Sequence, residues 1–300
     1  MVERSDVVVI GGAIMGASVA FWLTRLAPGI RVRVVEPDPS YANAATALSV
    51  ASIRSQFSNA INVQISRFGI DFIRNFSSWT GPEGGVADLG LTENGYLFLA
   101  GTEEGAATAR EIAAMQQGLG AATEVLDRAA LAHRFPWLAL DDVVAGSFGP
   151  RDEGWFDNMG FLGGLRAAAR AAGAEFMADR VVGFTRSGDR IATVQLASGA
   201  SLEAGETVIC AGTGATGLLR LLGEDWPVEP RKRTVFLIDA PNARHPGAPL
   251  MVDHRGYYLR PEHGHWITAT VPGDDGPCDP RDFDPDHAQF EEAIWPALYA

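Results

Sequence analysis

A short run of β-branched residues opens the chain and is followed by a glycine turn. Residues 6–10 are almost continuously apolar, which is typical of a buried parallel strand. After the turn, residues 14–26 form a helical pattern with small side chains on one face, and Pro28-Gly29 ends it. Residues 31–36 are again strand-like until Pro37. The pattern predicts a strand–helix–strand unit of about thirty residues.

The rest of the chain mixes helical and strand patterns. A helix is expected to begin at an N-cap at Ser58 or Asn59, and its apolar residues recur at spacings of four and three. Turns at 187–189 and 197–199 divide residues 181–208 into a β-meander, which a second strand-to-glycine turn follows at 208–212. The expected helical face comprises Ile61, Ile65, Phe68, Phe72 and Phe76, the other expected helices span 103–117, 158–172, 215–222 and 290–298, and the other strands span 96–99, 143–148, 175–177, 233–238, 256–260 and 265–269.

This order of elements predicts an α/β (α+β) fold with two interleaved domains. Strand–helix–strand character at the start and in the middle indicates a Rossmann-like domain with a central parallel sheet. Strands without intervening helices indicate an antiparallel sheet in the second domain. We expect residues 1–82 and 146–225 in the first domain, and 83–145 and 226–300 in the second.

Composition and charge exclude several classes of protein. The net charge is −13, so nucleic acid is not an expected partner. Arg231-Lys232-Arg233 is the one basic cluster, and a solvated strand end explains it. Cys210 and Cys278 are the only cysteines, which fits a reducing compartment. Residues 7–24 carry no charge, but the glycine pair and the helix after it do not resemble a signal peptide or a membrane span. We therefore expect a cytoplasmic protein.

No metal site is expected. Aspartates crowd residues 274–286, yet they lack the alternation and closing glutamate of an EF-hand loop, and interspersed prolines favour a solvated loop.

The glycine turn carries the first candidate chemistry. A dinucleotide fingerprint reads G-x-G-x-x-G, and here Gly11, Gly12, Ala13 and Gly16 occupy the corresponding stretch. The first glycine makes the bend, the second admits the pyrophosphate, and the third lets the helix pack on the strand. Ala13 stands at the second of these positions, where its methyl group is expected to cost about 1–3 kcal/mol of binding free energy. Gly12 is expected at an unconstrained position.

Glu36 ends the second predicted strand, twenty-five residues after Gly11. An acidic residue there accepts hydrogen bonds from an adenosine ribose and disfavours a 2′-phosphate, hence NADP. NAD and FAD share the fingerprint, so these residues leave both open.

Several spaced segments together resemble the D-amino-acid-oxidase-type FAD-dependent oxidoreductases, with sarcosine oxidase- and sarcosine dehydrogenase-like amine oxidoreductases as the closest group. The resemblance implies bound FAD, an antiparallel substrate domain, and oxidation of a secondary amine or amino acid at a C–N bond by hydride transfer to the flavin. The segments that carry it are residues 6–57, 208–212, 227–231, 257–261 and 290–296.

The resemblance also implies cofactor contacts. The first glycine turn would face the pyrophosphate, Glu36 the ribose, the segment at 44–48 the ribityl and phosphate portion, the backbone at 181–182 the adenine, and the second glycine turn the cofactor again. These residues are Gly11, Gly12, Ala13, Ile14, Met15, Gly16, Glu36, Ala44, Ala45, Thr46, Ala47, Leu48, Val181, Val182, Ala211 and Gly212.

Three departures from the resembled family predict a weakened site. One is Ala13, and another is the stretch 50–54, where relatives carry glycines before the Ile-Arg pair. The third is the end at Ala300, since relatives continue with a glycine-rich loop over the flavin. We expect weak or absent FAD, poor turnover and self-association. The alternatives are a flavin-poor or inactive relative acting as a binding or scaffold protein, and an NAD-dependent dehydrogenase.

Catalytic candidates follow from the same resemblance. Arg54 stands where sarcosine-oxidase-like enzymes place an arginine, and its planar fork suits a substrate carboxylate. Tyr258 and Arg260 share one face of a strand. His263 and His265 are possible bases, although structural roles explain them as well. Such oxidases use a lysine on the strand at 265–269 to promote reaction with oxygen, and none stands there. A dehydrogenase that passes electrons to another acceptor, such as a protein, is therefore favoured over an oxidase.

Overall fold

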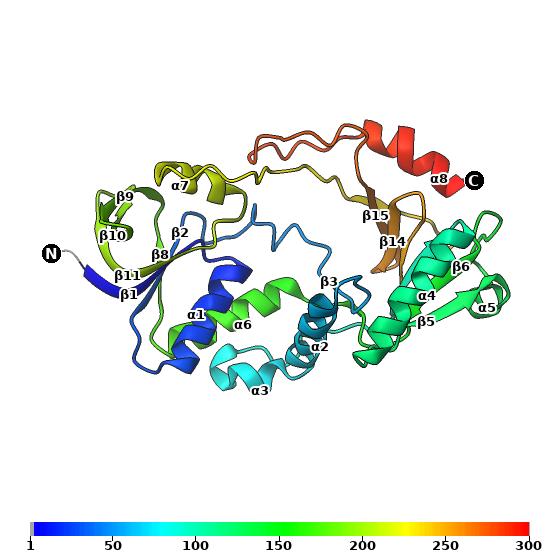
Figure 1. Ribbon diagram of the computed structural model, residues 1–300, viewed down its shortest axis with the longest axis horizontal. Coiled ribbons are helices and arrows are strands. Elements are labelled where there is room, and N and C mark those ends of the chain that lie inside the picture. Colours follow the sequence, from blue (N-terminus) through cyan, green and yellow to red (C-terminus); the bar gives the residue numbers. More distant parts are fainter. Residues whose placement is uncertain (1–2, 300) are drawn as a thin grey trace. The chain divides into compact units, whose positions relative to one another are not determined.

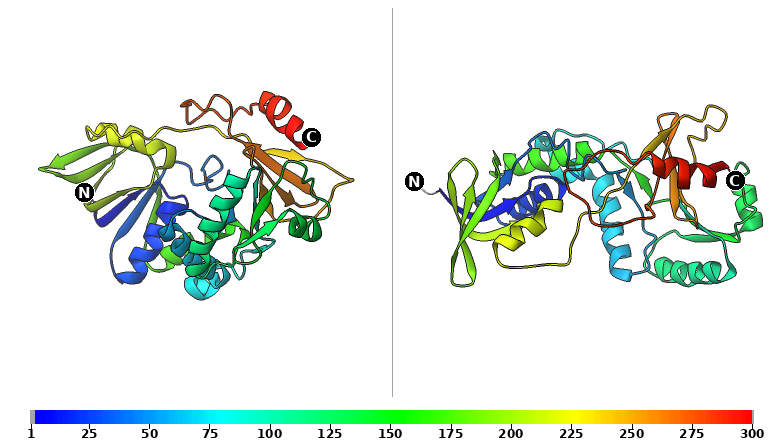
Figure 2. Two further views of the ribbon diagram at one scale, coloured as in Figure 1. Left: turned by 45° about the vertical axis from the view of Figure 1, so that its right-hand side comes forward. Right: turned by 90° about the horizontal axis from the view of Figure 1, so that it is seen from above.

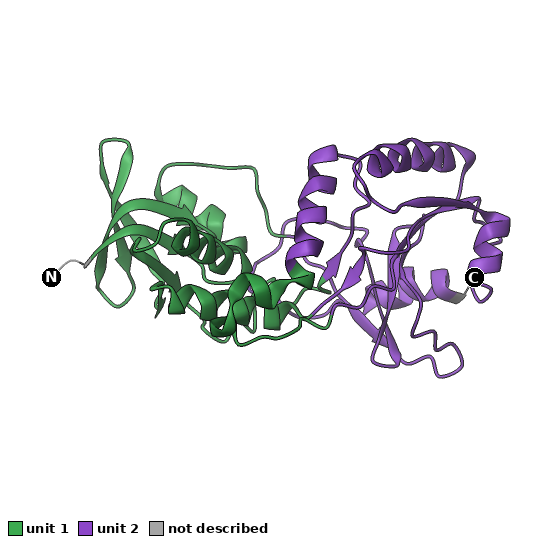
Figure 3. Ribbon diagram, turned by 90° about the horizontal axis from the view of Figure 1, so that it is seen from below, with its two compact units in different colours: residues 1–51, 73–90, 157–230 green, residues 52–72, 91–156, 231–300 purple. Residues whose placement is uncertain are grey.

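The computed structural model describes residues 3–299, and side chains within 4–298. The chain forms two compact units, one of residues 1–51, 73–90 and 157–230, the other of residues 52–72, 91–156 and 231–300 (Figure 3). Interleaving was predicted, but the boundaries differ. Residues 52–72 and 146–156 belong to the second unit, because β3 (Ser52–Ile53) pairs with β7 (Gly154–Trp155) and the strand at 145–149 joins the second sheet.

The first unit is built on a six-stranded sheet (Figure 1). Four neighbouring strands are parallel, and the last three strands in the order form an antiparallel meander. The predicted β-meander and strand–helix–strand unit are thus confirmed. The order is β8 (Glu175–Ala178), β2 (Val32–Glu36), β1 (Glu3–Ile10), β11 (Ser201–Ile209), β10 (Arg190–Leu196) and β9 (Val181–Ser187).

Helices cover both faces of this sheet (Figure 2). Val8 and Ile10 of β1 point to a core that Leu218 of α7 (Ala215–Leu221) joins. Val9 points the other way, toward α1 (Ile14–Leu26), which packs against α6 (Asn158–Ala171). Because side chains alternate along a strand, a continuous apolar run such as β1 buries both faces.

Short helices complete the first unit. α3 (Phe76–Thr80) and the 3₁₀ turn Pro82–Gly84 pack against α6, and a second 3₁₀ turn, Gly212–Gly214, precedes α7. Phe76 of α3 meets Phe161 of α6 edge to face, with ring centroids 5.2 Å apart.

The second unit is built on a seven-stranded sheet, antiparallel except where β13 runs parallel to β4. Its helices are α2 (Ala60–Arg74, which extends past the unit's boundary), α4 (Glu103–Gly118), α5 (Arg128–Arg134) and α8 (Trp295–Tyr299), the last preceded by a π-helical turn, Phe290–Ile294. The strand order is β12 (Phe236–Ile238), β15 (His265–Thr270), β14 (Tyr257–Glu262), β13 (Leu250–Val252), β4 (Tyr96–Ala100), β6 (Ala145–Gly149) and β5 (Glu124–Asp127).

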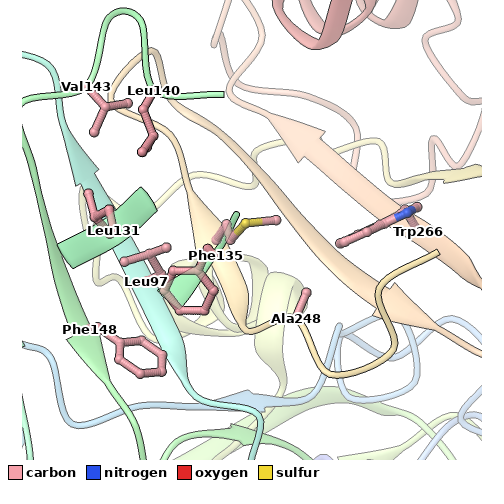
Figure 4. Packing of buried hydrophobic residues seen from close by; sticks show 9 residues of the cluster. Leu97, Leu131, Phe135, Leu140, Val143, Phe148, Ala248 and Trp266 are labelled. Carbon is pink, nitrogen blue, oxygen red and sulfur yellow. The ribbon is translucent and has the colours of Figure 1, made fainter. Parts of the chain in front are cut away.

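One face of this sheet carries the second unit's hydrophobic core (Figure 4). Leu97 and Phe148 are directly paired across β4 and β6, and Leu131 of α5 covers them. Trp266 of β15 contributes its ring to the core and donates its indole N–H to the Ala243 carbonyl at 2.8 Å. The opposite face of this sheet carries Tyr96, Phe98, Tyr258 and Arg260.

The helix at α2 corrects one prediction. The structure buries Val63, Ile70 and Ile73 together with Phe72, whereas Ile61, Ile65 and Phe68 are exposed. Phe76 belongs to α3. The sequence offers two apolar stripes on this helix, and periodicity chose the wrong one for Ile61, Ile65 and Phe68, whereas Phe72 and Phe76 are buried as expected. The elements β5, α5 and β13 also escaped prediction because their short sequences carry little periodicity.

The basic cluster and the aspartate-rich stretch pair with each other. Lys232 contacts Asp282 at 2.5 Å, and Arg233 binds both carboxylate oxygens of Asp275 at 2.7 and 2.9 Å. Over residues 3–299, no group of three or more histidine, cysteine or acidic side chains could hold a metal ion. No described helix combines the length and apolarity needed to cross a bilayer.

Candidate functional site

The carboxyl ends of β1, β2 and β11 meet at one edge of the first sheet, where parallel α/β sheets bind ligands. Gly11 follows β1 in the left-handed region (φ +96°), and its N–H donates to the Val35 carbonyl at 2.9 Å. A Cβ at Gly11 would lie 2.4 Å from the Cys210 carbonyl oxygen. Gly11 is therefore required where the chain bends between two parallel strands, as predicted.

The other two glycines are also constrained. A Cβ at Gly16 would lie 1.8 Å from the Gly11 carbonyl oxygen, so α1 approaches the strand end too closely for any side chain. A Cβ at Gly12 would lie 3.0 Å from Tyr41 Oη and 3.2 Å from Glu36 Cβ. The expectation that Gly12 is unconstrained was wrong, because a side chain from the following loop packs there. Ala13 has an ordinary extended backbone (φ −68°, ψ −165°), so its methyl group strains nothing locally.

The amino terminus of α1 is open to an anion. Ala13 is its N-cap and makes no side-chain cap, and no acidic residue stands in the first turn. The Ile14 N–H donates to Thr46 Oγ1 at 3.2 Å, and the Asn158 amide donates to the Thr46 carbonyl. The predicted segment at 44–48 thus lies at the helix start, with Thr46 buried and Leu48 exposed. A helix amino terminus without an acidic cap favours phosphate.

Glu36 is held at the same edge by backbone groups. Its two carboxylate oxygens accept from the N–H groups of Gly12 at 2.8 Å and Asp38 at 2.9 Å. Each oxygen retains a lone pair for a further donor. The position suits the ribose hydroxyls of an adenosine.

Tyr41 and Arg166 belong to this region and were not predicted. Tyr41 is 3% exposed and adopts a left-handed backbone (φ +58°), which is uncommon for a bulky residue. Arg166 Cζ lies 4.5 Å from the centroid of its ring, and Arg166 Nε is buried without a hydrogen-bond partner. Burial raises the pKa of Tyr41, so its hydroxyl stays protonated. The available signal was a lone aromatic residue in the small-residue loop at 37–56.

The second glycine turn adjoins the first. Gly212 is left-handed (φ +53°), and Ala211 Cα would lie 3.1 Å from a Cβ at Gly11. Val181 at the start of β9 is buried in the core, whereas Val182 is half exposed. The two turns, the open helix start and the held carboxylate are the features an extended dinucleotide requires, so the residues present fit FAD.

A second group of predicted residues meets on the sheet of the second unit, on the face away from its core. Val252 of β13 is in register with both Phe98 of β4 and Tyr258 of β14. Paired residues share a face, so Tyr96, Phe98, Tyr258 and Arg260 all point to this side. We call this surface the arginine face.

Arg54 lies on the arginine face, directly after β3. Its guanidinium carbon lies 4.6 Å from the ring centroid of Phe57, 5.2 Å from that of Phe98 and 5.5 Å from that of Tyr96. Its Nε is buried and has no hydrogen-bond partner. Aromatic rings hold a cation without satisfying its N–H groups, so this arginine remains able to donate to a ligand.

Arg260 and Tyr258 are more fully engaged. Arg260 is buried, pairs with Glu262 at 2.6 Å, and lies 4.8 Å from the centroid of the Trp155 ring. Burial raises the pKa of Tyr258 to about 12, with Tyr96 adding to the effect. His263 is exposed and contacts Glu262 at 2.6 Å, while His265 Nδ1 lies 3.3 Å from the His263 carbonyl oxygen. The structure thus brings Arg54, Tyr258 and Arg260 together.

Glu153 is a further buried acid that sequence reasoning missed. It is 1% exposed, and its oxygens accept from the Ser55 N–H at 2.7 Å and the Gln56 side-chain amide at 2.8 Å. Burial raises its pKa to about 7. Its signal in sequence was weak, because an acid next to a glycine reads as a loop.

Comparison with known proteins finds relatives that match nearly the whole chain. FAD-dependent oxidoreductase domain-containing protein 1 is 35% identical in Bos taurus (99% of this chain, 68% of that protein) and 34% in Xenopus laevis (99% and 66%). The chain spans about two thirds of the length of these curated relatives.

Solved structures share the fold. L-proline dehydrogenase from P. horikoshii superposes with a TM-score of 0.83 at 24% identity, covering 100% of this chain and 79% of that one. Glycine oxidase from Geobacillus kaustophilus superposes with a TM-score of 0.80 at 22% identity, covering 99% and 78%. The profile of the FAD dependent oxidoreductase (DAO) family matches residues 6–300. The chain therefore belongs to this family of FAD-dependent oxidoreductases, as the resemblance implied, and FAD is its cofactor.

Proposed function

We propose that the protein oxidises the C–N bond of a small amino acid or secondary amine that carries a carboxylate, of the sarcosine, glycine or proline type. The observation that carries this proposal is Arg54, an arginine held by three aromatic rings with a buried N–H that nothing satisfies. Related folds include L-proline dehydrogenase, glycine oxidase and iminodiacetate oxidase, and each of these names denotes action on a small carboxylated amine.

Arg54 has the role of binding the substrate carboxylate. A guanidinium presents a planar fork to the two oxygens, and the surrounding rings fix its plane and exclude water. The chemistry that FAD supplies when bound is acceptance of a hydride from the carbon next to the substrate nitrogen.

Tyr258 and Arg260 have supporting roles. Tyr258 stays protonated near neutral pH because its pKa is about 12, so its hydroxyl can donate a hydrogen bond to a substrate oxygen. Arg260 already pairs with Glu262, and its part is to shape the arginine face and to add positive charge.

A dehydrogenase is favoured over an oxidase. The side chains of β15 are His265, Trp266, Ile267, Thr268, Ala269 and Thr270, and Lys232, the sole lysine of the sequence, pairs with Asp282. No lysine therefore stands on the strand where the resembled oxidases use one. An acceptor other than oxygen, such as an electron-transfer protein, would reoxidise the flavin.

Anaerobic flavin reduction tests the proposal. FAD-loaded protein is mixed with sarcosine, glycine or L-proline and with carboxylate-free dimethylamine or pyrrolidine, and flavin bleaching is followed. Arg54→Lys should lower the apparent affinity for the carboxylated substrates about tenfold or more and leave the plain amines within about twofold, since lysine keeps the charge but loses the fork.

The matched control is Arg110→Lys on the exposed surface of α4, which should change neither class. If no carboxylated amine bleaches the flavin, or if Arg54→Lys affects both classes equally, the proposed function is wrong.

A further inference from the structure

The carboxyl group of Glu153 fixes the segment that carries Arg54. Its two oxygens hold the backbone N–H of Ser55 and the side chain of Gln56, the two residues after Arg54. Gln56 extends the contact by donating to the Tyr96 carbonyl at 2.9 Å and accepting from Ser147 Oγ at 2.7 Å. The bonds tie the segment to the two strands that lie beneath it.

The Glu153 carboxyl lies against Gly149 of β6, where only glycine leaves space for it. A Cβ at Gly149 would lie 2.1 Å from Glu153 Oε2, so the carboxyl packs directly on the backbone of β6. β3 ends directly before Arg54, and β7 begins directly after Glu153. These two strands pair with each other, Ser52 opposite Trp155 and Ile53 opposite Gly154. A carboxyl held by two hydrogen bonds and packed on backbone can respond to a nearby charge by changing its protonation.

The charges around Glu153 make Arg54 its main electrostatic partner. Burial opposes the ionised form of Glu153, whereas the hydrogen bonds from Gln56 and Ser55 and then the charge of Arg54 favour it, and the resulting pKa is about 7. The rings around Arg54 do not neutralise it as a carboxylate would. The other titratable groups nearby are Tyr96 on β4, Arg260 with Glu262 over the Trp155 ring, Glu93, and Asp152, which lies 3.7 Å from Arg67.

We propose that Glu153 is the positioning residue of Arg54 and that it takes up a proton from solvent when a carboxylate binds the guanidinium. The proposal rests on the proposed function, since it needs Arg54 to bind a carboxylate. A bound anion adds a second negative charge beside Arg54, and two carboxylates sharing one cation in a buried place favour protonation of one of them. Burial already disfavours the ionised form of Glu153, so Glu153 is the one of the two that takes up the proton.

Linkage sets the direction of the effect. If carboxylate binding takes up a proton, raising the pH must weaken carboxylate binding. We expect the dissociation constant to rise about five- to tenfold from pH 6 to pH 8.5, with most of the change above pH 7. An uncharged ligand should show no such change.

The test uses the FAD-loaded protein and a probe that does not titrate in this range. Methoxyacetate matches sarcosine in size but has an ether oxygen in place of the amine, and methoxyacetamide is its uncharged counterpart. Ligand-observed NMR titrations from pH 6 to pH 8.5 give both dissociation constants. In Glu153→Gln the methoxyacetate constant should change less than about twofold over this range, whereas Glu93→Gln, an exposed glutamate of the same unit, should keep the wild-type slope.

A merely structural role gives a different result. Loss of positioning alone would weaken methoxyacetate binding at every pH and leave the slope unchanged, which would overturn the proton uptake. If Glu153→Gln does not fold, the wild-type protein decides. Calorimetric titration at pH 7 in buffers of different ionisation enthalpy should report uptake of about half a proton on binding, and uptake near zero would overturn the inference.

The two proposals fail separately. If Arg54→Lys binds methoxyacetate as tightly as wild type, the carboxylate site itself is wrong. If Arg54→Lys weakens methoxyacetate binding but no proton is taken up, Arg54 keeps its role and the inference about Glu153 is wrong.

Discussion

The two candidate regions are built in different ways. The edge of the first sheet that carries the two glycine turns, here called the cofactor edge, has its tightest contacts in one short stretch, with Gly11, Gly12 and Gly16 within six residues. The arginine face of the second unit consists of side chains from segments as far apart as Arg54 and Arg260. Backbone that approaches backbone tolerates almost no added atom, whereas a side-chain surface can change residue by residue. We therefore expect the glycine turn to tolerate substitution less well than the arginine face.

The largest effect is expected from adding one methyl group to the cofactor edge. Gly16→Ala should lower the free energy of unfolding by about 3 kcal/mol or more, because the new Cβ would lie 1.8 Å from a carbonyl oxygen that cannot move cheaply. Urea unfolding of both proteins measures it. Gly163→Ala in α6 is the control. A Cβ at Gly163 would meet no other atom, and alanine suits a helix better than glycine, so this substitution should raise the free energy of unfolding by about 0.5–1 kcal/mol. Equal effects of the two substitutions would show that the edge is adaptable.

Buried Glu153, beneath the segment that carries Arg54, should make the free energy of unfolding depend on pH. Glu153 has a pKa of about 7 in the folded protein and 4.5 as its ordinary value, so between these pH values the folded state binds more protons than the unfolded state. The free energy of unfolding should therefore fall by on the order of 3 kcal/mol as pH rises from about 4.5 to 7 and then level off.

Urea unfolding at several pH values checks this. Glu153→Gln should remove that part of the slope, whereas Glu93→Gln should retain it. If the free energy of unfolding of Glu153→Gln still falls between pH 4.5 and pH 7, other titratable groups cause the pH dependence.

A smaller effect is expected at Ala13. If its methyl group crowds the pyrophosphate, Ala13→Gly should tighten FAD binding about tenfold, equivalent to about 1.4 kcal/mol. The backbone of Ala13 is unstrained, so any gain reflects contact with the cofactor and not relief within the chain. Fluorescence titration of the apoprotein with FAD measures it, and equal dissociation constants would show that the turn accommodates the methyl group.

The smallest effect is expected at Ala51, in the stretch where relatives carry glycines. Ala51 is left-handed (φ +51°), a conformation that costs an alanine about 1–2 kcal/mol. Ala51→Gly relieves this strain but adds freedom to the unfolded chain, so a net gain of about 0.5–1 kcal/mol is expected. Gly212→Ala, at a similar φ of +53° with open space around it, should lose a similar amount. If the melting temperature of neither variant differs from that of the wild type, backbone strain at these positions is negligible.

The cofactor edge was largely predictable from the sequence. The strand, turn and helix of residues 6–26 are local, and the close packing at Gly11 and Gly16 and the place of Glu36 at the strand end follow from their spacing. Gly12 was misjudged because its constraint comes from Tyr41, which reaches it from a loop without regular structure. Local motifs specify what one segment does, but not which distant side chain packs on it.

The arginine face depended on the tertiary structure. The sequence identified Arg54, Tyr258 and Arg260 as candidates, and the alternation of one strand placed the last two together. Only strand pairing through β13 set them beside Phe98, and only folding buried Glu153 beneath the Arg54 segment. The sequence by itself determined a dinucleotide-type glycine turn and the alternation of the strands that it predicted, because both follow from local backbone geometry. Strand register, burial and the resulting charge balance were decided by the folded chain, because they depend on contacts between residues far apart in sequence.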